Sequence, residues 1–191
     1  MCLGLYNAPS TFSRLMDLVL HGLTYLYCLV YLDDTIVYSK SFEEHVKHLE
    51  EILTRIIKAK LKLNPEKCVL AAEEVAYLGY IVTKDGIKPD PAKVQAINDI
   101  KFPKDPKEMI RFLGLVNFYR DFIKRFSFTA SILYKMAQST QKFKAKLKCK
   151  EVYLAFEKLK ASLTLQPILN YPNFKLPFLI QTDLRVVQLV V

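Results

Sequence analysis

Two adjacent aspartates, Asp33 and Asp34, interrupt the stretch "CLVYLDDTIVYSK" between two short apolar runs. Each run is rich in Val, Ile, Leu and Tyr and is too short for a helix, so the pattern predicts a β-hairpin over residues 28–38 that turns near the aspartates. Tight hairpin turns favour Asn-Gly or Asp-Gly because their central residues need positive φ, yet this turn contains no glycine. Two neighbouring carboxylates also repel each other. Local rules broken at one place indicate a functional site.

Metal binding is the chemistry that such a pair of carboxylates can perform. Mg²⁺ takes oxygen ligands and is usually held by one or two carboxylates together with substrate phosphates. Two-metal phosphoryl transfer uses such a clamp on the attacking and leaving oxygens. On spacing alone, a plain exposed turn is the commoner explanation of an Asp-Asp pair, so the metal site is a hypothesis at this point.

The rest of the chain mixes short strands with helices. Helical spacing covers residues 10–26, where Ser10 is a candidate N-cap, and residues 42–60, where Ser41 and Glu44 form a capping-box pattern. The stretch "EVAYLGYIVTKDGIK" predicts a second hairpin that turns at Gly86. Asp90-Pro91 and Asp105-Pro106 each predict the start of a helix, another helix is expected over 151–163, and "LPFLIQTD" is typical of a strand. No βαβ regularity is present, so the predicted class is α+β.

Composition limits the kind of protein. Of the 191 residues, 51% are hydrophobic, which predicts a folded chain of one domain or two small ones. The longest apolar passage, residues 18–32, is shorter than the ~20 residues that span a bilayer, and no secretory leader is expected. The four cysteines are scattered without a Cys-x-x-Cys pair, which favours free thiols in a reducing compartment. These features predict a non-secreted protein of the cytoplasm, or of the nucleus, without membrane partners.

Positive charge is concentrated in the second half. Residues 101–160 hold 15 Lys and Arg against 5 Asp and Glu, which leaves 13 basic and 14 acidic residues elsewhere. Aromatic residues alternate with these cations in "RFLGLVNFYRDFIKRF", and a basic surface with rings suits a nucleic-acid backbone and its bases. The alternative is that the lysines form a solvated face and that the rings belong to the core, because the apolar residues of this stretch recur at helical spacing.

Several motifs together resemble a known family. The box "YLDD" is preceded by "LGLYNAPSTFSRLMD" and followed by "LKLNPEKC", "VAYLGYIV", "GIKPDPAKVQAI" and "RFLGLVNFYRDFI". In this order they resemble the polymerase polyprotein of long-terminal-repeat retroelements of the gypsy class, from Met1 to about Asp183. The resemblance implies a partial reverse-transcriptase palm with a helical thumb and an α/β connection. The implied domains are the C-terminal part of the palm (1–89), the thumb (90–138), the connection (139–175) and a truncated, diverged start of a ribonuclease H-like domain (176–191).

The resemblance also implies roles for particular residues. Asp33 and Asp34 would be the catalytic ligands of Mg²⁺ or Mn²⁺, and Asp183 would be a vestigial nuclease carboxylate. Leu78, Gly79 and Tyr80 would form the hairpin that grips the primer end. The nucleotide and template pocket would be lined by Leu3, Gly4, Asn7, Pro9 and Tyr31. Contacts of the thumb with nucleic acid would be made by Arg111, Asn117, Tyr119, Arg120, Lys124 and Arg125.

Two functions follow from the resemblance. The first is RNA-directed DNA polymerisation, in which a primer 3′-hydroxyl attacks a deoxynucleoside triphosphate on an RNA or DNA template–primer duplex. The second is a catalytically dead retroelement remnant that at most binds nucleic acid through its basic thumb. The family needs a third carboxylate, on a palm strand upstream of "LGLYNAPSTF", as well as fingers, and we expect this chain to lack both. Catalysis by the isolated chain is therefore not expected, because metal ligation and nucleotide positioning each contribute several kcal/mol.

Overall fold

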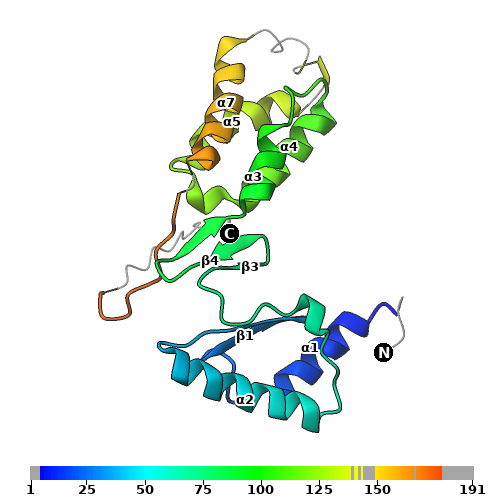
Figure 1. Cartoon of the computed structure of the whole chain (residues 1–191). Helices are drawn as coiled ribbons and strands as arrows, with labels where there is room; N and C mark the ends of the chain where they lie inside the picture. Colours follow the sequence, from blue (N-terminus) through cyan, green and yellow to red (C-terminus); the bar gives the residue numbers. More distant parts are fainter. Residues whose placement is uncertain (1–4, 139, 142, 144–148, 166, 178–191) are drawn as a thin grey trace, which may run out of the picture.

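The computed structural model describes residues 5–138, 140–141, 143, 149–165 and 167–177. These residues form two bodies stacked end to end (Figure 1). A small lower body holds α1, β1, β2 and α2, and a larger upper body is built mainly from helices. Each body has its own hydrophobic cluster, and the two clusters share no residue.

The lower body contains the predicted hairpin between two helices. Strands β1 (Cys28–Tyr31) and β2 (Asp34–Val37) pair antiparallel with Tyr31 opposite Asp34, which confirms the hairpin. Helix α1 (Ala8–Val19) contacts β1, and helix α2 (Phe42–Lys58) contacts β2. Their apolar sides enclose a small core of Met16, Leu20, Leu23, Cys28, Ile52 and Ile56.

The two helices of the lower body begin differently from each other. Ser41 caps α2 by accepting a hydrogen bond from the Glu44 amide at 3.2 Å, as predicted. The prediction of Ser10 as the N-cap of the first helix is wrong, because α1 already begins at Ala8 and Ser10 lies inside it. Pro9 in the first turn explains the earlier start, since proline fixes a helical φ where no amide partner is needed.

Polar and ring contacts attach the hairpin to α2. The Tyr27 ring stacks on His48 with centroids 3.9 Å apart, and its hydroxyl donates to Glu51 at 2.5 Å. Burial and then this hydrogen bond raise the pKa of Tyr27 to about 12. The Ser39 hydroxyl lies 2.7 Å from His48 Nδ1. These contacts hold the open end of the hairpin, opposite its turn, against α2.

A three-stranded antiparallel meander connects the two bodies. It follows the short helix η1 (Pro65–Lys67) and consists of β3 (Val75–Tyr77), β4 (Tyr80–Val82) and β5 (Ile87–Pro89) in the order β3-β4-β5. The sequence predicts one turn here, at Gly86, and the chain makes a second one at residues 78–79. Tyr80 and Ile87 pack against the upper core, so the meander is joined to the upper body by packing.

Helices build the upper body. They are α3 (Pro91–Asn98), α4 (Pro106–Phe118), the short η2 (Arg120–Phe122), α5 (Phe126–Ala137) and α7 (Lys150–Thr164). Asp90 accepts from the Ala92 amide and Asp105 from the Glu108 amide, which confirms both predicted caps. The core is dominated by α4, α5 and α7, with Phe112 and Phe156 in ring contact at 4.4 Å.

The segment after α7 returns to the meander. Leu169 and Ile87 exchange two backbone hydrogen bonds of 2.9 Å, and the Tyr171 hydroxyl donates to the Thr83 carbonyl at 2.7 Å. This segment thereby covers the free edge of β5. Only the first two residues of the predicted strand "LPFLIQTD" belong to the described part of the chain.

The fold is α+β, as predicted from the mixture of elements. Among the described residues, no helix combines the length and the apolar composition that crossing a membrane requires. The domain bounds inferred from the sequence stay predictions.

Candidate metal and nucleic-acid site

The aspartate turn has the strained backbone that its sequence implies. Leu32 and Asp33 form a two-residue turn between Tyr31 and Asp34, and Leu32 has a φ of +53°. Positive φ is uncommon for a bulky residue and costs of order 1–3 kcal/mol, so the surrounding structure must enforce it. The turn needs positive φ but has no glycine, so the structure places the strain at Leu32, next to the two carboxylates.

Both carboxylates are exposed, and no described residue forms an ion pair with them. In the part of the chain that the structure describes, neither the Asp33 carboxylate nor the Asp34 carboxylate takes part in a hydrogen bond or an ion pair. The charge of Asp34 reaches the meander: the pKa of Tyr77 is raised, first by burial and then by this carboxylate. Free oxygen ligands on adjacent residues fit Mg²⁺, which accepts one or two protein carboxylates together with phosphate oxygens.

The described residues place no third protein ligand beside Asp33 and Asp34. Within the described ranges, no group of three or more His, Cys, Asp or Glu side chains could hold a metal ion. The exposed Asp17 lies on α1 and does not join the pair. Asp33 and Asp34 therefore stay candidate ligands, to which the described residues add no third side chain.

The proposed pocket residues are only partly brought together. Tyr31 lies next to the aspartate turn and is 56% exposed. Asn7 and Pro9 lie at the N-terminal end of α1 and are exposed, and no described hydrogen bond joins their side chains to the aspartates. Leu3, Gly4 and, at the other end, Asp183 lie outside the described residues.

The turn of the candidate primer-grip hairpin is held against α4. Leu78 and Gly79 have φ values of +51° and +82°, as a tight hairpin turn requires. The carbonyl of Gly79 accepts a hydrogen bond of 2.8 Å from the Tyr119 hydroxyl and one of 3.3 Å from the Asp90 amide. This turn is therefore fixed by residues that follow α4 and precede α3.

Most of the basic candidates are exposed. Arg111 and Asn117 lie on the outer side of α4, Arg120 pairs loosely with Asp121 at 3.6 Å, and Lys124 and Arg125 precede α5.

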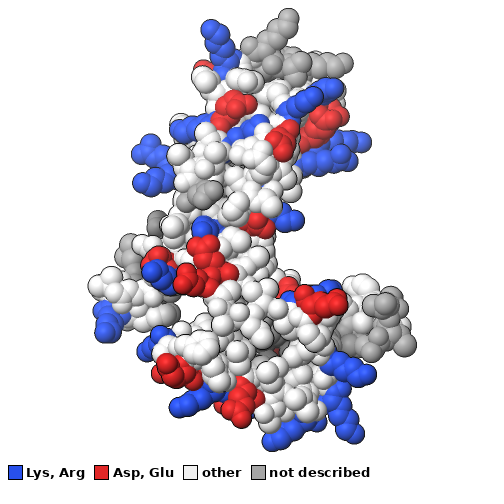
Figure 2. Space-filling model, in the orientation of Figure 1, with Lys and Arg blue, Asp and Glu red and all other residues white. Residues whose placement is uncertain are grey.

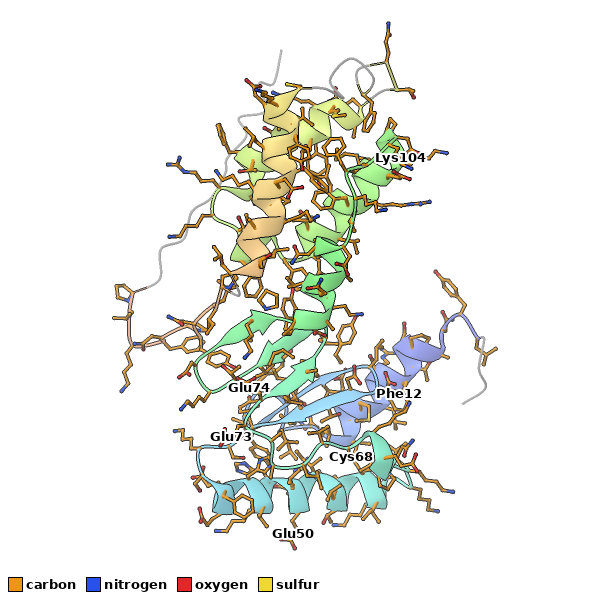
Figure 3. All side chains as sticks on the ribbon, turned by 45° about the horizontal axis from the view of Figure 1, so that its top comes forward. Phe12, Glu50, Cys68, Glu73, Glu74 and Lys104 are labelled. Atoms are coloured by element: carbon orange, nitrogen blue, oxygen red, sulfur yellow. The ribbon has the colours of Figure 1, made fainter. Side chains whose placement is uncertain are left out.

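An ion pair is formed where the chain enters the meander. Glu74, labelled in Figure 3, binds Lys88 there through both carboxylate oxygens at 2.9 Å. Lys104 lies far from this point, beside the start of α4.

Tyr119 needs a correction among these candidates. It is only 3% exposed, and its hydroxyl is engaged with Gly79, so its ring has no surface to offer to a duplex. The alternative that rings belong to the core holds for Phe112, Tyr119 and Phe122. It fails for Phe118, which is 51% exposed.

Sequence reasoning missed Gly114 and Phe118 as surface features. Together with Lys107 and Arg111 they occupy positions i, i+4, i+7 and i+11 of α4, which form one stripe along the helix. All four residues are exposed. A Cβ at Gly114 would meet no atom within 4 Å, so internal packing does not explain a glycine here. A helix-interior glycine without an internal reason is the signal that could have identified this stripe.

The chain is similar to proteins of known kind. Residues 1–82 match the family model described as "Reverse transcriptase (RNA-dependent DNA polymerase)". The chain is 43% identical to the retrovirus-related Pol polyprotein from transposon 297 and 37% identical to that from transposon gypsy, both of Drosophila melanogaster. These matches cover 96% and 94% of the chain but 17% and 18% of the relatives, so it spans less than a fifth of their length.

Solved structures agree in fold. A foamy viral protease-reverse transcriptase in complex with double-stranded DNA aligns with a TM-score of 0.78 at 24% identity, over 93% of this chain and 37% of that one. The same kind of protein in complex with an RNA/DNA hybrid aligns with a TM-score of 0.74 at 25% identity, over 89% and 23% of the two chains.

Proposed function

Because this chain is a reverse-transcriptase region of the gypsy-type retrotransposon polyproteins, we propose that it supplies two metal-binding carboxylates and the duplex-binding helices of an RNA-directed DNA polymerase. The observation that carries the proposal is the strained hairpin turn, which presents Asp33 and Asp34 without any described counter-charge. The comparisons give no support to the alternative of a catalytically dead remnant.

Asp33 and Asp34 would hold Mg²⁺ or Mn²⁺ with oxygen atoms from the substrates and from a further carboxylate. When bound, such an ion stabilises charge on the attacking and leaving oxygens of phosphoryl transfer. The chain's own residues would position the reactants: the hairpin fixes the carboxylates, and Tyr31 would line the pocket of the deoxynucleoside triphosphate and template. Leu78, Gly79 and Tyr80 would place the primer end whose 3′-hydroxyl attacks.

We assign the domains of the chain on the same basis. Residues 1–89 would be the C-terminal part of the palm, 90–138 the thumb, 139–175 the connection and 176–191 the start of a ribonuclease H-like domain containing Asp183. The separate cores of the two bodies support a division between palm and thumb. The meander would then be a palm element that packs on the thumb.

The exposed stripe of α4 would contact the template–primer duplex. Lys107 and Arg111 supply charge for phosphates, Phe118 supplies a ring, and Gly114 leaves room for a close approach. Figure 2 shows Lys and Arg along both flanks of the upper body, with acidic side chains between them. On the face shown, acidic side chains therefore interrupt the basic surface, which favours contact through one helix face.

Duplex binding and metal dependence test the proposal. We expect the chain to bind a template–primer duplex with an affinity that falls steeply between 50 and 200 mM salt, because phosphate contacts release counterions. We also expect primer extension by the transposon 297 polyprotein whose matching segment is replaced by this chain, and loss of that extension when a chelator removes divalent cations. Salt-independent binding would exclude the duplex-binding role, and extension that persists in the chelator would exclude the metal role.

Substituting Gly114 should separate binding from stability. Gly114→Ala should raise the free energy of unfolding by about 0.5–1 kcal/mol, because alanine is the better helix former and its Cβ meets no atom. The same variant should weaken duplex binding at least about threefold, because a methyl group would stand where a duplex approaches. Urea unfolding and fluorescence anisotropy measure the two effects. Unchanged affinity in the stabilised variant would remove Gly114 from the interface.

A further inference from the structure

Two tyrosines join the turn at residues 78–79 to the end of α4 by reciprocal hydrogen bonds. The Tyr119 hydroxyl donates to the Gly79 carbonyl at 2.8 Å, and the Tyr80 hydroxyl donates to the Phe118 carbonyl at 3.2 Å. The Phe118 carbonyl belongs to the last turn of α4, where carbonyls lack partners within the helix. Each tyrosine thus satisfies a backbone group of the other element.

Aromatic rings packed between these two hydrogen bonds restrict the movement of the turn relative to α4. Tyr80 stacks on Phe118 with centroids 5.1 Å apart and meets Tyr119 edge-on at 5.7 Å. A Cβ at Gly79 would lie 3.3 Å from Phe118 Cε1, so the turn approaches the helix as closely as a glycine allows. Phe118 is therefore in contact with the turn and is also half exposed on the α4 stripe.

The Tyr119 hydroxyl is a constant donor in this arrangement. Burial raises the pKa of Tyr119 to about 12, and the charge of Asp90 adds to the shift. The proton therefore stays on the hydroxyl throughout the neutral range, and the bond to Gly79 does not depend on pH there.

We propose that Tyr119 is a positioning residue, which holds the Leu78–Gly79 turn at a fixed distance from the duplex-facing stripe of α4. The turn and the stripe then form one rigid unit that places a primer terminus relative to the duplex behind it. This inference rests on the proposed function, because it assumes that the turn meets the primer end and that α4 meets the duplex. Tyr119 is buried, yet through the turn it would set where the end of the bound duplex lies.

The test compares two DNA ligands with the full chain at low salt. One is a template–primer with a recessed 3′ end, and the other is a continuous duplex of the same length. We expect the wild-type chain to prefer the recessed end. Tyr119→Phe should lower that preference about five- to tenfold, the effect of one lost hydrogen bond, and should keep the affinity for continuous duplex within about twofold. Tyr134→Phe is the matched control, because Tyr134 is exposed on α5.

Each outcome of this binding experiment tests either the proposed duplex-binding function or the positioning role of Tyr119. If the wild-type chain binds neither ligand, the proposed duplex-binding function fails. If it binds both equally, or if Tyr119→Phe keeps the preference for the recessed end, the positioning inference is overturned while duplex binding stands. A parallel loss of both affinities, with a lower midpoint in urea, would show that Tyr119 only stabilises the fold. Selective loss of the end preference supports the inference.

Discussion

Replacing Asp33 with Asn should reduce primer extension at least about a hundredfold in the transposon 297 polyprotein that carries this chain. Stabilisation of transition-state charge by a bound metal ion is worth several kcal/mol, and each 1.36 kcal/mol is a factor of ten in rate. The amide keeps the size of the side chain but loses the charge that attracts the cation. Single-nucleotide extension under single-turnover conditions measures the chemical step directly.

Stability should not follow activity in this variant. Asp33 is exposed, lies beside another carboxylate and has no described partner, so removing its charge relieves repulsion rather than breaking a contact. We expect the urea midpoint to stay the same or to rise slightly. Asp17→Asn is the control, because Asp17 is an exposed aspartate on α1, and its extension rate should match the wild type. Full activity of Asp33→Asn would refute the assignment of Asp33 as a metal ligand.

Gly86→Ala should destabilise the upper body by about 3 kcal/mol. Gly86 has a φ of +150°, which side chains rarely adopt, and strain of this kind costs of order 1–3 kcal/mol. A Cβ there would also lie 2.2 Å from the Leu169 carbonyl oxygen, so the backbone of the returning segment would have to move. The two hydrogen bonds between Ile87 and Leu169 would be lost or stretched.

The matched control for this substitution is Gly114→Ala, which adds the same methyl group in open space on a helix. The two variants should therefore move the urea midpoint in opposite directions. Hydrogen exchange should show faster opening at residues 83–89 and 167–171 in Gly86→Ala, with no change in the lower body, which has its own core. A midpoint equal to that of the wild type would show that the returning segment is not held at Gly86.

Local rules predicted the aspartate hairpin and most helix starts. The hairpin at residues 28–38 follows from two short apolar runs, and its strain follows from the lack of a glycine where positive φ is needed. The caps at Ser41, Asp90 and Asp105 follow from side-chain oxygens placed before a first turn. These features depend on neighbours in the sequence, so a single sequence suffices to find them.

Local sequence patterns predicted only part of the meander. The single predicted turn at Gly86 overlooked the turn at residues 78–79, because a leucine at positive φ is unfavourable by itself. Contacts with the end of α4, about 40 residues later in the chain, hold that conformation. The burial of Tyr119 is decided in the same way, since helical spacing does not show which ring faces a partner.

The sequence by itself determined the α+β class, the aspartate pair with its strained turn, and the concentration of positive charge in the second half. These properties lie in composition, short-range spacing and backbone preferences, which act before any distant segments meet. The tertiary structure alone decided that Tyr119 supports the Gly79 turn, that Phe118 lies against the same turn, and that residues 167–171 cover β5. Each of these depends on packing between residues far apart in the chain, which no local pattern encodes.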